Sequence, residues 1–139
     1  LNTLARISLE QGKDEQAERL SQRALLIWQR TVGLEHPNAA FPLDVLATLY
    51  CKQGKYEQAE SFYKQALQIR EQRLDPFHPG TAQTLYGFAL LCQKQGNLQT
   101  AVSFAERSLK IRLQTLGDDH PQTVAARELY ALLTQEHSD

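Results

Sequence analysis

Three histidines recur at one spacing and are the residues of this chain most suggestive of metal chemistry. His36, His78 and His120 follow one another every 42 residues, and each is followed directly by proline. Zinc binds imidazole nitrogens at about 2.0–2.1 Å, so one ion needs its ligands at a single point. If each histidine opens its own helix pair, neighbouring histidines lie on the order of 10 Å apart. The spacing therefore predicts no metal site and indicates that each histidine packs or caps at a helix start.

The other groups that could do chemistry are two cysteines and the carboxylates. Cys51 and Cys92 form no Cys-x-x-Cys motif, and no histidine falls on the matching helix faces. We therefore expect buried or half-buried thiols rather than nucleophiles. Acidic residues such as Asp14 and Glu57 fall in the first turns of predicted helices, where negative charge is favourable. No glycine-rich phosphate-binding motif is present, so we predict a chain that is not an enzyme, with no catalytic residues and no cofactor.

Composition narrows the class of partner. The 139 residues include 15 Lys+Arg and 16 Asp+Glu, a net charge of −1. That balance argues against nucleic-acid binding, and no apolar stretch approaches the roughly 20 residues that span a bilayer. Two cysteines cannot form a disulfide framework, which favours a reducing, cytoplasmic location. Because the chain opens on Leu1 rather than Met, we expect a fragment of a longer protein.

The elements that position these residues repeat every 42 residues. Residues 12–53 and 54–95 share 17 of 42 positions, and residues 54–95 and 96–137 share 16 of 42. A fixed period of this length indicates stacked supersecondary units, each of which buries its apolar face against the next. We predict a single domain over residues 1–139, with a partial repeat at 1–11 and full periods at 12–53, 54–95 and 96–137.

Each period predicts two helices. Glycines at 12, 54 and 96 suit a left-handed residue after a helix end, and the prolines after the three histidines suit a first helical turn. The predicted helices, about seven, cover residues 1–11, 14–32, 37–52, 56–74, 79–94, 98–116 and 121–136. Pro42 lies inside the third of these, so that helix is either kinked or begins nearer Ala40.

Three residues at one phase of the period stand out on the second helix of each pair. Trp28 is followed at the same phase by Arg70 and Arg112. We expect the two arginines to form surface ion pairs, each of small energetic value. Trp28 has two interpretations: it packs on a preceding repeat, or it marks a partner surface.

Together these residues resemble the tetratricopeptide (TPR) repeat in its 42-residue form. The resemblance rests on Leu46-Ala47-Thr48-Leu49-Tyr50, Ala66-Leu67-Gln68-Ile69-Arg70-Glu71 and the linker Leu116-Gly117-Asp118-Asp119-His120-Pro121. It is similar to the arrays of kinesin light chains and of NB-ARC/STAND signalling ATPases. The resemblance implies an all-α TPR α-solenoid, a right-handed superhelix of antiparallel helix pairs. It also implies a non-catalytic protein–protein interaction module that binds a peptide or domain in a concave groove.

The groove positions of the family carry over onto the first helices of the pairs. They fall on Asn2, Arg6, Leu9, Phe41, Asp44, Thr48, Lys52, Gln83, Tyr86, Leu90, Gln93 and Lys94, then on Glu128, Leu132 and Gln135. Arg6, Lys52 and Lys94 supply positive charge, and Tyr86 and Leu90 supply an apolar platform. Gly87 either leaves a hollow beside Tyr86 or allows close helix packing. We therefore expect a protein or peptide ligand that is acidic and carries one large apolar anchor.

Two alternatives to a peptide-binding adaptor stay open at this point. The chain could be the sensor or regulatory arm of a STAND-type ATPase, or a structural solenoid that self-associates through its terminal repeats. The flanking sequence of the parent protein would separate the first alternative from an adaptor. The molecular mass measured by light scattering at several protein concentrations would separate self-association from an adaptor.

Overall fold

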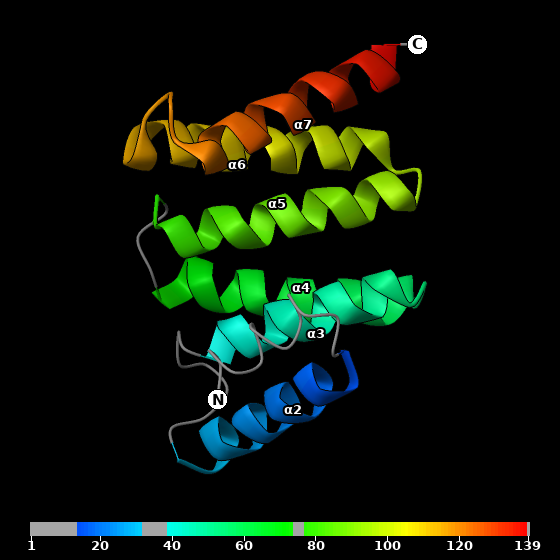
Figure 1. Ribbon diagram of the computed structural model, residues 1–139, viewed down its shortest axis with the longest axis vertical. Helices are drawn as coiled ribbons and strands as arrows, with labels where there is room; N and C mark the ends of the chain where they lie inside the picture. Colours follow the sequence, from blue (N-terminus) through cyan, green and yellow to red (C-terminus); the bar gives the residue numbers. More distant parts are fainter. Residues whose placement is uncertain (1–13, 32–38, 74–76, 139) are drawn as a thin grey trace. The chain divides into compact units, whose positions relative to one another are not determined.

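The chain folds entirely into α-helices in the parts that the structure describes. The computed structural model describes residues 14–31, 39–73 and 77–138 (Figure 1). Its helices are α2 (Asp14–Thr31), α3 (Ala40–Lys52), α4 (Tyr56–Arg73), α5 (Pro79–Lys94), α6 (Leu98–Leu116) and α7 (Pro121–Ser138). These ranges confirm the all-α prediction and six of the predicted helices to within a few residues. The helix predicted at 1–11 lies outside the described residues.

The predicted start of one helix is wrong. The sequence pattern places the beginning of the third helix at Pro37, whereas α3 begins at Ala40 and follows Ala39, which makes no side-chain cap. Pro42 is then the third residue of the helix. At that position the missing N–H is one of the donors that have no intrahelical acceptor, so proline costs no backbone hydrogen bond. The interpretation that the helix begins nearer Ala40 is confirmed.

Glycines reverse the chain between the paired helices. Gly54 has φ +79° and Gly96 has φ +80°, the left-handed region that an L side chain disfavours. After α3, the Gly54 N–H donates to the Cys51 carbonyl at 3.1 Å and the Lys55 N–H donates to the Tyr50 carbonyl at 2.8 Å. This pair of bonds satisfies carbonyls at the end of α3. The turn lets α4 run back along α3, and the same turn at Gly96 lets α6 run back along α5.

The phased histidines cap helices. His78 precedes α5, and its Nδ1 accepts the Gly80 N–H at 2.9 Å. His120 does the same before α7, where its Nδ1 accepts the Gln122 N–H at 3.1 Å. Each bond satisfies one of the free donors of a helix N-terminus. The predicted capping role is confirmed for these two residues, while His36 lies outside the described residues.

The chain divides into two compact units, Leu1–Leu74 and Asp75–Asp139. In the first unit α3 packs against both α2 and α4. One apolar cluster joins α3 to α4 through Leu43, Ala66 and Ile69. Another joins α2 to α3, and there the Tyr50 hydroxyl donates to the Glu18 carboxylate at 2.7 Å. That bond, with burial and the negative charge of Glu18, raises the pKa of Tyr50.

In the second unit α6 packs against both α5 and α7. Alanines of both units are fully buried, including Ala59 and Ala101 on second helices and Ala47 and Ala89 on first helices. Phe88 and Phe104 meet across the α5–α6 interface with ring centroids 4.6 Å apart. Small residues let the helices approach, and the aromatic rings fill the remaining space.

Candidate peptide-binding surface

The predicted groove residues of the second unit share one face of α5. Gln83 and Lys94 are exposed, and Tyr86, Leu90 and Gln93 are half-buried. Their spacing of three or four residues places them in one stripe along the helix. The buried residues of α5, among them Leu85, Phe88 and Leu91, occupy the rest of its circumference. The structure therefore brings these five side chains together on the open side of the helix.

Beneath this stripe lies a buried guanidinium. Arg112 of α6 is 6% exposed, and its guanidinium carbon lies 4.7 Å from the centroid of the Tyr86 ring. Its Nη1 donates to the Gln122 carbonyl at 3.0 Å, while its Nε has no hydrogen-bond partner. Cation–π contact with a tyrosine contributes about 0.5–2 kcal/mol, depending on desolvation. Tyr86 is thus half-buried, and its ring lies over the Arg112 cation.

The burial of Arg112 corrects the sequence-based expectation of a surface ion pair. Desolvation lowers the pKa of Arg112, and the nearby Tyr86 opposes that shift. Arg70, at the same phase in the first unit, is also 6% exposed. Both arginines are buried because each extends from the second helix of its pair across the neighbouring first helix. The 42-residue period correctly places the two arginines at equivalent positions. Their exposure, however, depends on which neighbouring helix covers each side chain.

The first unit presents a more closed version of the same surface on α3. Phe41 packs on Ala17, Val45 and Leu49, and Lys52 is exposed. Asp44 is buried, and its Oδ2 lies 3.0 Å from Arg70 Nη1, with the two side chains 8% and 7% exposed. A predicted groove carboxylate is therefore already neutralised within the fold.

Thr48 links the backbone of Asp44 to the buried Tyr63. Its hydroxyl donates to the Asp44 carbonyl at 2.9 Å and shares a hydrogen bond of 3.1 Å with the Tyr63 hydroxyl. Burial raises the pKa of Tyr63 well above its usual range, against the opposing effect of the Thr48 bond. Thr48 is half-buried, so only part of its side chain is accessible.

The remaining predicted groove residues lie at the two ends of the chain. Glu128, Leu132 and Gln135 are exposed on α7, with Leu132 at 48%. Asn2, Arg6 and Leu9 lie outside the described residues. The side chain of Trp28 is outside them as well, so both of its interpretations stay predictions.

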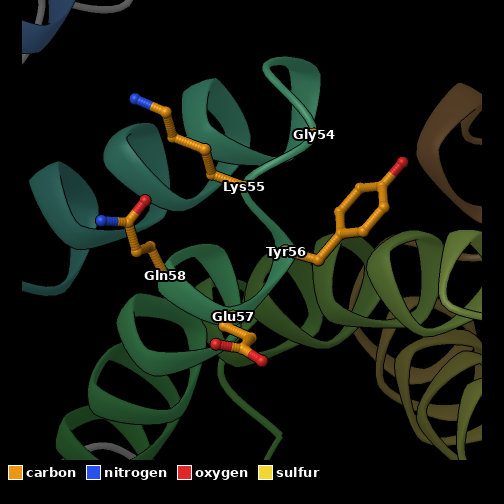
Figure 2. Close-up of a pocket in the computed structure, with 5 residues that line it drawn as sticks. All are labelled: Gly54, Lys55, Tyr56, Glu57 and Gln58. Atoms are coloured by element: carbon orange, nitrogen blue, oxygen red, sulfur yellow. The ribbon is translucent and has the colours of Figure 1, made fainter.

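A hollow of about 510 Å³ lies at the turn from α3 into α4. Figure 2 shows its lining residues, Gly54, Lys55, Tyr56, Glu57 and Gln58, with Lys55 and Gln58 extending to one side and Tyr56 and Glu57 pointing away from them. The ammonium of Lys55 lies 5.6 Å from the centroid of the Tyr50 ring. Groups that diverge cannot act together on one ligand atom. The four side chains therefore do not converge on a single point in the hollow.

The cysteines and the potential metal ligands are the other groups that the sequence singles out for chemistry. Cys51 and Cys92 are buried free thiols, as expected. No three His, Cys, Asp or Glu side chains cluster as metal ligands among the described residues. None of the described helices is long and apolar enough to cross a membrane.

Sequence reasoning missed the two buried arginines, although a signal for them was present. Arg70 follows Ile69 and Arg112 follows Ile111, and both isoleucines are buried. An arginine that recurs at one phase beside a buried residue indicates a repeated structural contact rather than a solvated charge. The residue that each arginine contacts on the first helix of its pair differs between the units: Arg70 contacts Asp44, and Arg112 contacts Tyr86.

Comparison with known proteins agrees with the repeat. The family model described as tetratricopeptide repeat matches residues 1–72, 43–114 and 80–139. A crystal structure of the nearly identical TPR-like repeats of a candidate kinesin light chain from Podosopora anserina is 26% identical, with a TM-score of 0.85 over 99% of this chain and 65% of that one. A point variant of that protein gives 25% identity and the same TM-score, with the same shares of the two chains.

A third structure, BtubC (BKLC) from P. vanneervenii, shares the fold. Its TM-score is 0.83 at 21% identity, over 98% of this chain and 54% of that one. No curated protein matches the sequence. The chain spans about two thirds or less of the length of each of these three structures. The resemblance to STAND ATPases rests on the sequence pattern alone and stays a prediction.

Proposed function

The chain belongs to the tetratricopeptide repeat family, and from this premise we propose that it binds a partner peptide on the exposed face of α5. TPR domains generally mediate protein–protein interaction and are generally non-catalytic. We propose that this one forms the docking part of a larger cytoplasmic adaptor or signalling protein. A fold alone does not assign a ligand, so the proposal rests on the side chains of that face.

The observation that carries the proposal is the stripe of Gln83, Tyr86, Leu90, Gln93 and Lys94. The side chains combine an apolar platform, amide donors and a cation along one helix face. An extended or helical peptide can lay an apolar side chain on such a platform while polar groups fix its register. Peptide binding on this helix face requires neither catalytic residues nor a cofactor.

Charge on α5 favours an acidic peptide. The sequence of α5 contains no Asp or Glu and ends in Lys94. Within the first unit, α3 by itself has the same character: its single acidic residue, Asp44, is neutralised by Arg70, and it ends in the exposed Lys52. Complementary charge steers association and discriminates between partners more than it adds raw affinity. We therefore propose a ligand with acidic residues beside one large apolar anchor.

Peptide-pool binding to the whole chain tests this proposal. Three nonapeptide pools would carry a central Leu or Phe flanked on both sides by Glu, Gln or Lys. We expect the glutamate pool to bind best. Lys94→Glu should weaken its binding several-fold, whereas Lys110→Glu, the same charge change on α6, should have little effect.

Equal binding of the glutamate and lysine pools, together with no effect of Lys94→Glu, would refute the proposed ligand class. Light scattering of the unliganded chain over a range of concentrations tests the alternative of self-association. A mass that rises with concentration, without binding to any pool, would contradict the peptide-binding function.

A further inference from the structure

The two units have different residues at one position of the repeat, Asp44 in the first and Tyr86 in the second. This difference points to a binding role for Arg112. Resting on the proposed function, we propose that Arg112 binds a carboxylate side chain of the partner peptide. In the second unit that carboxylate takes the place that Asp44 occupies in the first. Tyr86 is then the residue that leaves the site open to a ligand.

The comparison between the units starts from residues in equivalent places. Arg70 and Arg112 lie one 42-residue period apart, and so do Asp44 and Tyr86. In the first unit the Asp44 carboxylate lies 3.0 Å from the Arg70 guanidinium. In the second unit the matching side chain is an aromatic ring, 4.7 Å from the Arg112 guanidinium. The first unit thus contains its own counter-ion at a position where the second contains none.

The Arg112 guanidinium is buried without an anionic partner among the described residues. It is 6% exposed, its Nε has no hydrogen-bond partner, and no carboxylate pairs with it among the described residues. Its guanidinium donates to the Gln122 carbonyl and lies against the Tyr86 ring. Removal from water disfavours a charge unless an opposite charge and hydrogen bonds compensate. A carboxylate that reached the guanidinium would gain a charge-assisted hydrogen bond, which is among the strongest available in proteins.

The position of Tyr86 explains how a ligand reaches Arg112. Tyr86 is half-buried in the exposed stripe of α5, beside Leu90 and Gly87, whereas Arg112 lies against its ring. A side-chain rotation of Tyr86 is a rotamer change that a peptide binding on this face can drive. The acidic residue of the peptide would therefore sit next to the apolar anchor rather than far along the chain.

Nuclear magnetic resonance of the arginine Nε–H groups tests the contact directly. The wild-type chain would be titrated with the most strongly bound glutamate nonapeptide and with its glutamine counterpart. We expect the Arg112 Nε–H resonance to shift with the glutamate peptide and to shift much less with the glutamine one. The Arg70 resonance is the internal control, because Arg70 already pairs with Asp44.

A matched pair of substitutions tests the role of Tyr86. Tyr86→Asp places a carboxylate opposite Arg112, as Asp44 is placed opposite Arg70. We expect it to abolish the preference for glutamate over glutamine peptides, which should be about tenfold or more in the wild type because a hydrogen bond to a charged group contributes that much. Tyr86→Asn removes the same ring without adding charge, so it should weaken the binding of both peptides through the lost platform but keep the ratio of their affinities.

The outcomes separate this inference from the proposed function. Binding of the glutamate peptide with an unmoved Arg112 resonance would overturn the carboxylate site while leaving peptide binding intact. Retention of the glutamate preference in Tyr86→Asp would overturn it as well. Absence of binding to every pool would refute the proposed function itself.

Discussion

Removal of the Asp44 carboxylate is the perturbation whose cost the structure defines most clearly. Asp44→Ala leaves the Arg70 guanidinium without the carboxylate that lies 3.0 Å from it, with 7% of the arginine side chain exposed. A buried charge that loses its counter-ion cannot recover the lost interaction from water. We expect the free energy of unfolding to fall by about 3–5 kcal/mol, the usual cost of breaking a buried pair from one side.

The Coulomb energy of the pair supports this magnitude. Two unit charges 3.0 Å apart attract by about 5.5 kcal/mol at an effective dielectric constant of about 20. The pair Glu60–Lys64 has nearly the same separation, 3.1 Å, but its side chains are 36% and 66% exposed. Exposed i,i+4 pairs contribute only about 0.3–0.5 kcal/mol. Burial, rather than distance, therefore sets the difference between the two pairs.

Urea denaturation followed by far-UV circular dichroism measures both changes. Asp44→Ala should lower the midpoint strongly, and the matched control Glu60→Ala should move it only slightly. The double variant Asp44→Ala/Arg70→Met should recover much of the loss, because removing both charges removes the uncompensated one. A loss for Asp44→Ala below about 1 kcal/mol, or no recovery in the double variant, would refute the reasoning.

Two further predictions concern the helix cap and the buried tyrosine. His78→Ala removes the acceptor of the Gly80 N–H and should lower the free energy of unfolding by about 1 kcal/mol. His78→Asn should retain most of that stability, since asparagine is a good N-cap. Equal losses for the two variants in thermal denaturation would contradict the capping role. Burial raises the pKa of Tyr63, so the folded chain keeps its phenolic proton at pH values where the unfolded chain, with a pKa of about 10, releases it. The free energy of unfolding should therefore fall as pH rises above about 10, and the fall should be smaller in Tyr63→Phe; urea titrations between pH 8 and 11 check this, and an unchanged slope in the variant would count against it.

The sequence by itself determined the helices and their caps. Periodic apolar residues, the glycines at 54 and 96 and the histidine–proline pairs act within one or two helical turns, so their effects do not depend on distant contacts. The left-handed φ of both glycines and the capping bonds of His78 and His120 follow from those local signals. The start of α3 was decided locally too, by Pro42, although the repeat phase pointed three residues earlier.

The surface of α5 was also predictable from the sequence, because the period places equivalent residues on equivalent faces. Gln83, Tyr86, Leu90, Gln93 and Lys94 do share the open side of that helix. Exposure on α3 was less predictable. Asp44 has the phase of a groove residue but is enclosed by a side chain from α4.

Only the tertiary structure decided the state of the two arginines. The sequence shows that Arg70 and Arg112 are equivalent, but long flexible side chains can reach either solvent or a neighbouring helix. Packing of α4 on α3 gives Arg70 a carboxylate, and packing of α6 on α5 gives Arg112 an aromatic ring. The physical reason is that burial and pairing depend on atoms brought together from different helices. Sequence periodicity therefore predicts where the arginines lie, and helix packing determines whether each has its own counter-ion.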